Sequence, residues 1–249
     1  MTSFKTRIRK ASAGKSKIIL ANDFDKLASQ KLVNKTIENI KNLGEFLCAI
    51  KLNFHLILPL GIKELKKINN AMHDTGLQTI ADIKLNDIRR TNSITTDALW
   101  QAGFDAIIVN PIMGQDNLEE LIDSAHRKKR GIITVVHMSS PESKLIYDIP
   151  IKVKNKKKSA KLYELFLDWS TSSHADGIIV GATFPEIIKS CRKKTKGSCD
   201  IYSPGIGTQG GSAQKSLTSG SDYLIVGRTI LNAKDPIKEA KKLQQLTIE

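Results

Sequence analysis

The sequence predicts an α/β fold, and within that class a (β/α)8 TIM barrel that forms one domain over residues 1–249. Short runs rich in β-branched residues recur along the chain, and a stretch with the apolar spacing of an amphipathic helix follows each run. Several runs, such as Ala106–Val109, are apolar without alternation, which is typical of parallel strands that helices cover on both faces. The eight expected strands are residues 17–22, 46–52, 78–84, 105–110, 131–137, 177–181, 199–203 and 223–226.

The segments between these runs carry the signals of helix ends. Thr91 is placed to cap a helix that stops before Gly103. A doubly wound parallel sheet is the alternative fold, but it usually has fewer strands and a glycine-rich loop after the first of them. Asp23 and the two residues after it occupy that place here, so the barrel is the better interpretation.

Two segments lie outside the alternating pattern. Residues 1–15 are basic and lack the apolar stretch of a secretory signal, so we expect a short basic arm before the first strand. Residues 149–159 are rich in lysine, and we interpret them as an insertion after the fifth strand. Neither segment has the composition of a linker to a second domain.

The chain is strongly basic, with a formal net charge of +14 and a pI near 9.6. Its densest basic clusters, residues 152–158 and 192–196, contain no aromatic residue, and aromatic residues make up only 5% of the chain. Stacking platforms for bases are therefore scarce, and a solvated lysine-rich surface is a better interpretation than a specific nucleic-acid partner.

Two further features bear on location. No apolar run approaches the ~20 residues that span a bilayer, so we expect no membrane association. The three cysteines, Cys48, Cys191 and Cys199, show no spacing typical of zinc or redox sites. A reducing cytoplasm is the expected compartment.

Charged side chains stand where the first three strands end. Asp23 follows the first strand, Lys51 ends the second, and Asp82 and Lys84 lie two residues apart in the third. Residues at that spacing share a face of a strand, and two opposite charges in a semi-buried barrel mouth must pair with each other. With Asp87 they form a Lys-Asp-Lys-Asp quartet at the barrel end where catalytic residues gather. Taken alone, the motif also fits a surface turn with a salt bridge.

The far end of the chain carries a pattern typical of phosphate binding. The seventh strand runs into a glycine-rich loop from Pro204 to Gly211, and the eighth ends in Gly227-Arg228. In barrels these two loops commonly hold a phosphate through backbone N–H groups, and arginine supplies a forked, permanently charged donor. The loop residues that we assign to phosphate binding are Pro204, Gly205, Gly207, Gln209 and Gly210.

The fifth strand ends in His137-Met138-Ser139. The Ser139 hydroxyl is placed to contact a planar ligand. His137 and Met138 are neighbours in a strand, so one of them faces the helices. We interpret His137 as a core histidine, or one that lies behind the site, rather than a catalytic residue.

Taken together, these motifs resemble the family of orotidine 5′-phosphate decarboxylase in its compact archaeal form, from the first strand to the last helix. The resemblance rests on Asp23, Lys51, the sequence Asp82-x-Lys84-x-x-Asp87-Ile88-x-x-Thr91, Met138-Ser139, the loop from Pro204 to Gly211, and Gly227-Arg228. It implies release of CO2 from orotidine monophosphate (OMP) to give UMP, without a metal or another cofactor.

The resemblance also implies a role for each residue. Lys84 protonates C6 of the pyrimidine, Asp82 lies against the departing carboxylate, and Lys51 and Asp87 complete the catalytic network. Asp87 and Thr91 act in the site of the neighbouring subunit of a homodimer. The substrate-binding residues it implies are Asp23, Lys51, Asp82, Ile88, Thr91, Ser139, Pro204, Gly205, Gly207, Gln209, Gly210, Gly227 and Arg228.

Two other functions remain as alternatives. Sister barrels that act on sugar phosphates share the DxKxxD pattern but use Mg2+ and carry a glutamate where this chain has Lys51, whose ammonium would repel the metal. A non-catalytic nucleic-acid-binding barrel would have no need of both the quartet and a phosphate loop. Two departures from the family pattern concern loops: Arg89-Arg90 replaces a frequent proline, and Asn110-Pro111 replaces a histidine.

Overall fold

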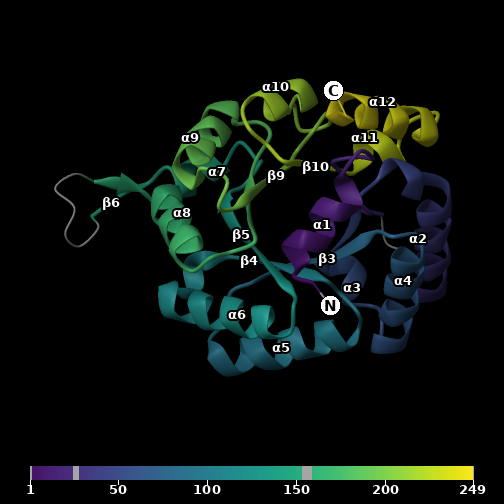
Figure 1. Cartoon of the computed structure of the whole chain (residues 1–249), viewed down its shortest axis with the longest axis horizontal. Coiled ribbons are helices and arrows are strands. Elements are labelled where there is room, and N and C mark those ends of the chain that lie inside the picture. The colour runs from purple at the N-terminus through teal and green to yellow at the C-terminus, as the bar shows by residue number, and fades with distance from the viewer. Residues whose placement is uncertain (1, 25–27, 153–158, 249) are drawn as a thin grey trace.

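The computed structural model describes residues 2–24, 28–152 and 159–248 and contains a closed barrel of parallel strands, so the predicted (β/α)8 barrel is confirmed (Figure 1). The strands neighbour one another in the order β1-β10-β9-β8-β5-β4-β3-β2. Their bounds are β1 Ile18–Ala21, β2 Ala49–Asn53, β3 Gln78–Leu85, β4 Ala106–Val109, β5 Gly131–His137, β8 Gly177–Val180, β9 Asp200–Pro204 and β10 Tyr223–Val226.

A ring of helices surrounds the strands (Figure 1). The helices that follow successive barrel strands are α2 Ser29–Leu43, α4 Ile62–Asp74, α5 Arg89–Gln101, α6 Gln115–Arg127, α8 Leu162–Ser172, α9 Pro185–Thr195, α10 Ala213–Thr218 and α12 Pro236–Ile248. The shorter helical elements are η1 Gly44–Phe46, α3 Phe54–Ile57, η2 Pro111–Met113, α7 Ser143–Tyr147 and α11 Arg228–Leu231.

The sequence pattern explains why these elements pack. In β1, β4, β8 and β10 all residues are buried, as expected of strands with side chains both in the barrel lumen and under the helices. Helix α6 buries Leu118, Leu121, Ile122 and Ala125, which lie three or four residues apart on one face. The apolar residues of both layers form one continuous core.

Residues 2–15 do not form an extended arm, and that prediction was wrong. Phe4–Ser12 forms a helix, α1, that crosses the N-terminal end of the barrel (Figure 1). Phe4 and Ile8 are fully buried, and a Cβ atom on Gly131 would lie 2.1 Å from the Phe4 ring. These two residues lie four apart, a helical spacing that the basic composition of the segment obscured.

The helix after the third barrel strand starts earlier than predicted. Helix α5 begins at Arg89 with Ile88 at its N-cap, so Thr91 lies in the first turn and does not cap it. The Asn92 side chain donates a hydrogen bond of 2.6 Å to the Asp87 carbonyl and holds the chain where it enters the helix.

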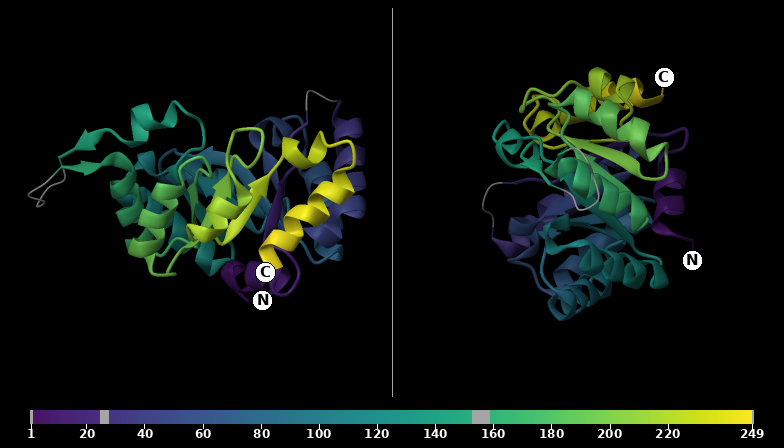
Figure 2. Two further views of the ribbon diagram at one scale, coloured as in Figure 1. Left: turned by 90° about the horizontal axis from the view of Figure 1, so that it is seen from above. Right: turned by 90° about the vertical axis from the view of Figure 1, so that its left-hand side faces the viewer.

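The expected insertion after β5, residues 149–159, includes the first strand of a small antiparallel pair, β6 (Pro150–Ile151), and is followed directly by the second, β7 (Ala160–Lys161). Residues 153–158, which carry most of its lysines, lie outside the described residues. Figure 2 shows this pair extending beyond the ring of helices, at the end of the barrel opposite α1.

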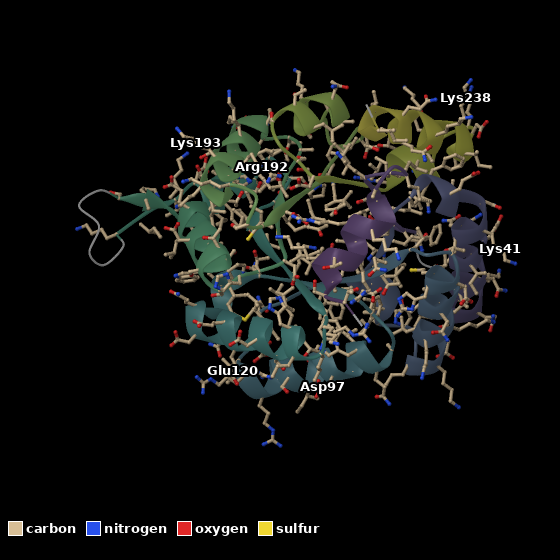
Figure 3. The ribbon with its side chains drawn as sticks, in the orientation of Figure 1. Lys41, Asp97, Glu120, Arg192, Lys193 and Lys238 are labelled. Atoms are coloured by element: carbon tan, nitrogen blue, oxygen red, sulfur yellow. The ribbon has the colours of Figure 1, made fainter. Side chains whose placement is uncertain are left out.

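The basic residues are spread over the helices, as expected from the sequence. Lys41 of α2, Lys193 of α9 and Lys238 of α12 all point away from the barrel (Figure 3). None of the helices in the described ranges is long and apolar enough to cross a membrane.

Candidate active site

A cavity of about 580 Å³ opens at the C-terminal ends of the barrel strands. Its floor is apolar and consists of side chains from five strands, Ala21, Ile108, Val135, Ile179 and Ile225. A cavity of this size and character suits a small organic molecule such as a nucleotide. The polar residues on its walls are Asp23, Lys51, Asn53, Asp82, Lys84, Ser139, Ser140, Thr208, Gln209 and Arg228.

One buried carboxylate holds two ammonium groups at one side of the cavity. Asp82 accepts hydrogen bonds of 2.8 Å from the Nζ atoms of both Lys51 and Lys84, one on each carboxylate oxygen. Lys51 and Asp82 are almost completely buried, whereas 43% of the Lys84 side chain is exposed to the cavity opening. The Lys84 ammonium is therefore the member of the group most accessible to a ligand.

A distortion of strand β3 directs Lys84. The pairing of β3 with β4 shifts register between Asp82 and Leu85, and Lys84 has a positive φ of 45°. Bulges of this kind re-aim side chains beside active sites, and a non-glycine residue at positive φ is strained. The predicted Asp82–Lys84 pair is present, and the bulge beside it was not predicted.

The charge balance of the group is visible in the pKa of Asp82. Burial raises this pKa, and the positive charges of Lys51 and Lys84 together with their hydrogen bonds outweigh burial, so the net pKa is lowered. Asp82 is therefore ionised at neutral pH.

Asn53 extends the network toward Asp23, and we did not predict it. Its side-chain oxygen accepts a hydrogen bond from Lys51, and its side-chain N–H donates to Asp23. Asn53 lies two residues after Lys51 in β2, so the same-face spacing that we applied to β3 would have identified it.

The glycine-rich loop after β9 forms the opposite wall of the cavity. Its backbone is folded on itself by hydrogen bonds between Gly207 and Gly211 (2.8 Å) and between Gly211 and Gly205 (3.0 Å). The Thr229 hydroxyl donates to the Ile206 carbonyl at 2.9 Å, and a Cβ atom on Gly207 would lie 2.3 Å from that hydroxyl. Thr229 was not predicted, since this close approach between the loop and helix α11 leaves no pattern in the sequence.

The predicted residues of this wall divide into two groups. Pro204, Gly205, Gln209, Gly227 and Arg228 line the cavity. Gly207 and Gly210 shape the loop instead: both have positive φ, 74° and 88°, which glycine adopts without strain.

Ser139 joins the β5 loop to the β9 loop. Its hydroxyl donates a hydrogen bond of 2.7 Å to the side-chain oxygen of Gln209. A Cβ atom on Gly181 would lie 2.5 Å from the Ser139 Cα, so this segment packs tightly against the end of β8.

Asp87, Ile88 and Thr91 do not reach the cavity of their own chain. All three are exposed, and the Asp87 carboxylate accepts the N–H of Ile88 at 2.7 Å. The structure therefore joins three members of the predicted quartet, and a single chain leaves Asp87 apart from them.

Comparison with known proteins agrees with this geometry. Residues 16–243 match the model of the family described as orotidine 5′-phosphate decarboxylase / HUMPS. The orotidine 5′-phosphate decarboxylase of Pyrococcus abyssi is 34% identical over 227 residues, which cover 91% of this chain and 96% of that relative. The chain belongs to the orotidine 5′-phosphate decarboxylase / HUMPS family.

Solved structures of orotidine 5′-phosphate decarboxylases share the whole fold. The enzyme of Pyrococcus horikoshii OT3 superposes with a TM-score of 0.73 at 31% identity, covering 93% of this chain and 99% of that one. The enzyme of Methanocaldococcus jannaschii, in complex with the inhibitor BMP, superposes with a TM-score of 0.77 at 25% identity, covering 94% and 100%. The resemblance seen in the motifs is thus confirmed.

Replacing Asp82 with Asn tests the charge balance of the site. The folded-state pKa of Asp82 lies below the value of about 3.9 in an unfolded chain. Its ionised form therefore stabilises the fold fully above that pH, and the contribution is lost as the pH falls through the folded-state pKa. We expect D82N to be less stable than wild type at about pH 7, and the difference to shrink toward about pH 3, in urea unfolding followed by circular dichroism.

The matched control is Asp74→Asn, which changes an exposed carboxylate of helix α4. It should show no comparable dependence on pH. A stability difference between D82N and wild type that stays constant over this range would contradict the assignment of a lowered pKa to Asp82.

Proposed function

We propose that this protein is an orotidine 5′-phosphate decarboxylase, which converts OMP to UMP and CO2 in pyrimidine biosynthesis without a metal or organic cofactor. One observation carries the proposal. The Lys51–Asp82–Lys84 group stands at one side of the cavity and the glycine-rich loop with Arg228 at the other. A nucleotide bound between them would present its base to the ammonium groups and its phosphate to the arginine.

Lys84 is placed to do the chemistry. When the bond between C6 and the carboxylate breaks, CO2 leaves and the electron pair stays on C6, where no conjugated system spreads it. The Lys84 ammonium stabilises this charge and then transfers a proton from Nζ to C6, leaving a neutral amine. Asp82, held between two lysines, orients the Lys84 ammonium, and it repels the substrate carboxylate more than neutral CO2.

The remaining contacts hold the substrate in place. We assign Asp23 and Lys51 to the ribose hydroxyls, Ser139 to the edge of the pyrimidine, and Gln209 and Arg228 to the phosphate. Binding of the distant phosphate supplies free energy that offsets the cost of orienting and desolvating the reacting carbon.

The Mg2+-dependent alternative fits this site poorly. Lys51 is buried, with its ammonium 2.8 Å from Asp82, so a positive charge already occupies the position next to the carboxylate that a divalent ion would use. The nucleic-acid alternative has no support from the cavity, whose polar groups surround a space of about 580 Å³, which suits a small molecule. The three cysteines are all buried free thiols, which favours a cytoplasmic location.

We further propose a homodimer in which Asp87 and Thr91 complete the partner's site, with Ile88 beside the substrate. Apolar side chains surround the same end of the barrel as the cavity. Phe54, the first residue after β2, is 54% exposed, and Ile88, three residues after the end of β3, is 67% exposed. Exposed apolar residues gathered around a site favour burial against another subunit.

The decisive experiment follows the loss of OMP absorbance in buffer that contains EDTA. Wild type should turn over, and Lys84→Ala should lose at least about 100-fold in rate while still binding UMP, because a positioned proton donor contributes ~10²–10⁴-fold. Lys67→Ala, an exposed lysine of α4, is the matched control. Activity that requires added Mg2+ would support the sugar-phosphate alternative instead.

The phosphate assignment predicts a substrate-dependent effect of Arg228→Ala. Loss of a charge-assisted hydrogen bond should lower kcat/KM for OMP about 10- to 100-fold. The same change should matter far less for orotidine, the nucleoside without phosphate. The test is to measure kcat/KM for both substrates with wild type, R228A and the exposed control Arg127→Ala. The difference between the two substrates isolates the contact between Arg228 and the phosphate. An equal loss for both substrates would remove Arg228 from the phosphate site.

The shared site predicts complementation between two inactive variants. In a mixture of Lys84→Ala and Asp87→Ala chains, half of the dimers combine one of each, and one of their two sites has both wild-type residues. About one quarter of wild-type activity should return after subunit exchange. Two variants that stay inactive in a mixture proven to contain mixed dimers would show that Asp87 acts in its own subunit.

A further inference from the structure

His137 faces away from the cavity because strand β5 changes register. Val135 lines the cavity, and regular alternation would place His137 on the same side. The pairing of β5 with β8 shifts between Val135 and His137, so the next residues are turned. Met138 now lines the cavity, and His137 packs among helices.

The His137 ring lies in an enclosure of aromatic side chains. Its centroid is 4.5 Å from the Phe184 ring, 5.2 Å from Tyr147 and 6.0 Å from Tyr163. The side chain is completely buried, and burial lowers the pKa of His137. At neutral pH the imidazole is therefore neutral, with one nitrogen protonated and the other a hydrogen-bond acceptor.

The neighbouring backbone determines which nitrogen carries the proton. Nδ1 lies 2.8 Å from the carbonyl oxygen of Met138, which can only accept, so Nδ1–H donates. Nε2 is then an acceptor, and it faces Oδ1 of Asp148 at 3.7 Å. Neither atom has a hydrogen-bond partner among the described residues. The Nδ1 contact therefore orients the ring. The acceptor Nε2 faces another acceptor, Asp148 Oδ1, and no hydrogen bond joins them.

The Met138 carbonyl is the link from His137 to the cavity. It accepts a second hydrogen bond, of 2.9 Å, from the Ser143 hydroxyl. The peptide that contains this carbonyl leads directly into Ser139, whose own carbonyl accepts from Thr183 at 2.9 Å. The orientation of the Met138 peptide therefore sets where the Ser139 hydroxyl points.

We propose that His137 is a positioning residue: through Nδ1–H and the Met138 carbonyl it holds Ser139 in place for the pyrimidine of the substrate. The role of Ser139 rests on the proposed function, whereas the contacts of His137 do not. Asp148, from the end of α7, is not required for this role. It faces Nε2, and its other oxygen lies 3.2 Å from Lys161 Nζ.

Two substitutions of His137 separate this role from simple filling of space. In Asn the side-chain N–H lies near the position of Nδ1 and can still donate to the Met138 carbonyl. In Gln the N–H lies one carbon farther out, near Nε2, and the donor to Met138 is lost. We expect His137→Gln to raise KM for OMP about tenfold with little change in kcat, because substrate and transition state lose the same contact. His137→Asn should retain a KM close to wild type.

A double-substitution cycle tests the link to Ser139. Ser139→Ala should raise KM by a similar factor. The combined H137Q/S139A variant should have a KM no higher than either single variant, since both changes remove the same contact between Ser139 and the pyrimidine. Equal KM values for H137N and H137Q, or additive effects of H137Q and S139A, would overturn the proposal. The wild-type protein is assayed first. If it does not turn over OMP, the proposed function is refuted, and the role of His137 is judged separately from its contacts.

Asp148→Asn provides a second test that leaves every atom of His137 in place, in case H137Q does not fold. Its side-chain N–H can donate to Nε2, which supplies the missing partner. We expect D148N to raise Tm and to leave KM for OMP unchanged, measured by thermal unfolding and by kinetics. Because D148N also removes the ion pair with Lys161, its Tm is compared with that of Lys161→Met, which removes that ion pair and keeps the Asp148 carboxylate. A Tm of D148N below that of K161M would show that Nε2 carries the proton, and the assignment of the Nδ1–H contact to Met138 would be withdrawn.

Discussion

The site of this protein depends on one carboxylate, Asp82, which binds two ammonium groups in an almost completely buried part of the barrel mouth. Either lysine alone would be costly to bury, and Asp82 alone would take up a proton. Together they leave a charged group with one member, Lys84, free enough to meet a ligand. The bulge in β3 and the Asn53 bridge to Asp23 both serve this group, because they fix where its charges point.

The opposite end of the barrel uses charges for stability. Asp105, Asp176, Asp200 and Asp222 immediately precede or begin four strands, and each is paired with a basic side chain. Asp105 illustrates the pattern: burial raises its pKa, but hydrogen bonds from His73 and Thr79 and the charge of Arg7 lower it overall. The two ends of one barrel thus separate the tasks of holding the fold together and binding a ligand.

The sequence was informative wherever a function depends on residue type at a strand end. The barrel, the Lys51–Asp82–Lys84 group and the lining by Gln209 and Arg228 all followed from spacing and chemistry. His137 was predicted as a core histidine or one behind the site, and it is buried. Spacing could not reveal features that arise from tertiary contact, namely the bulge at Lys84, the anchoring of the loop by Thr229 and the register shift of β5 that turns His137 away from the cavity. The helix α1 was missed for a different reason, since two buried residues in a basic segment give a weak periodic signal.

The barrel closes between its first and last strands, β1 and β10, and α1 adds the ion pair from Arg9 to Asp200 at 2.6 Å. These contacts join residues about two hundred positions apart, and such pairings slow folding because a long loop must be ordered first. During synthesis the first helix and strand leave the ribosome well before their partners exist. Their apolar surfaces are fully covered only once the last strand has been made, so the nascent chain is prone to aggregate until then.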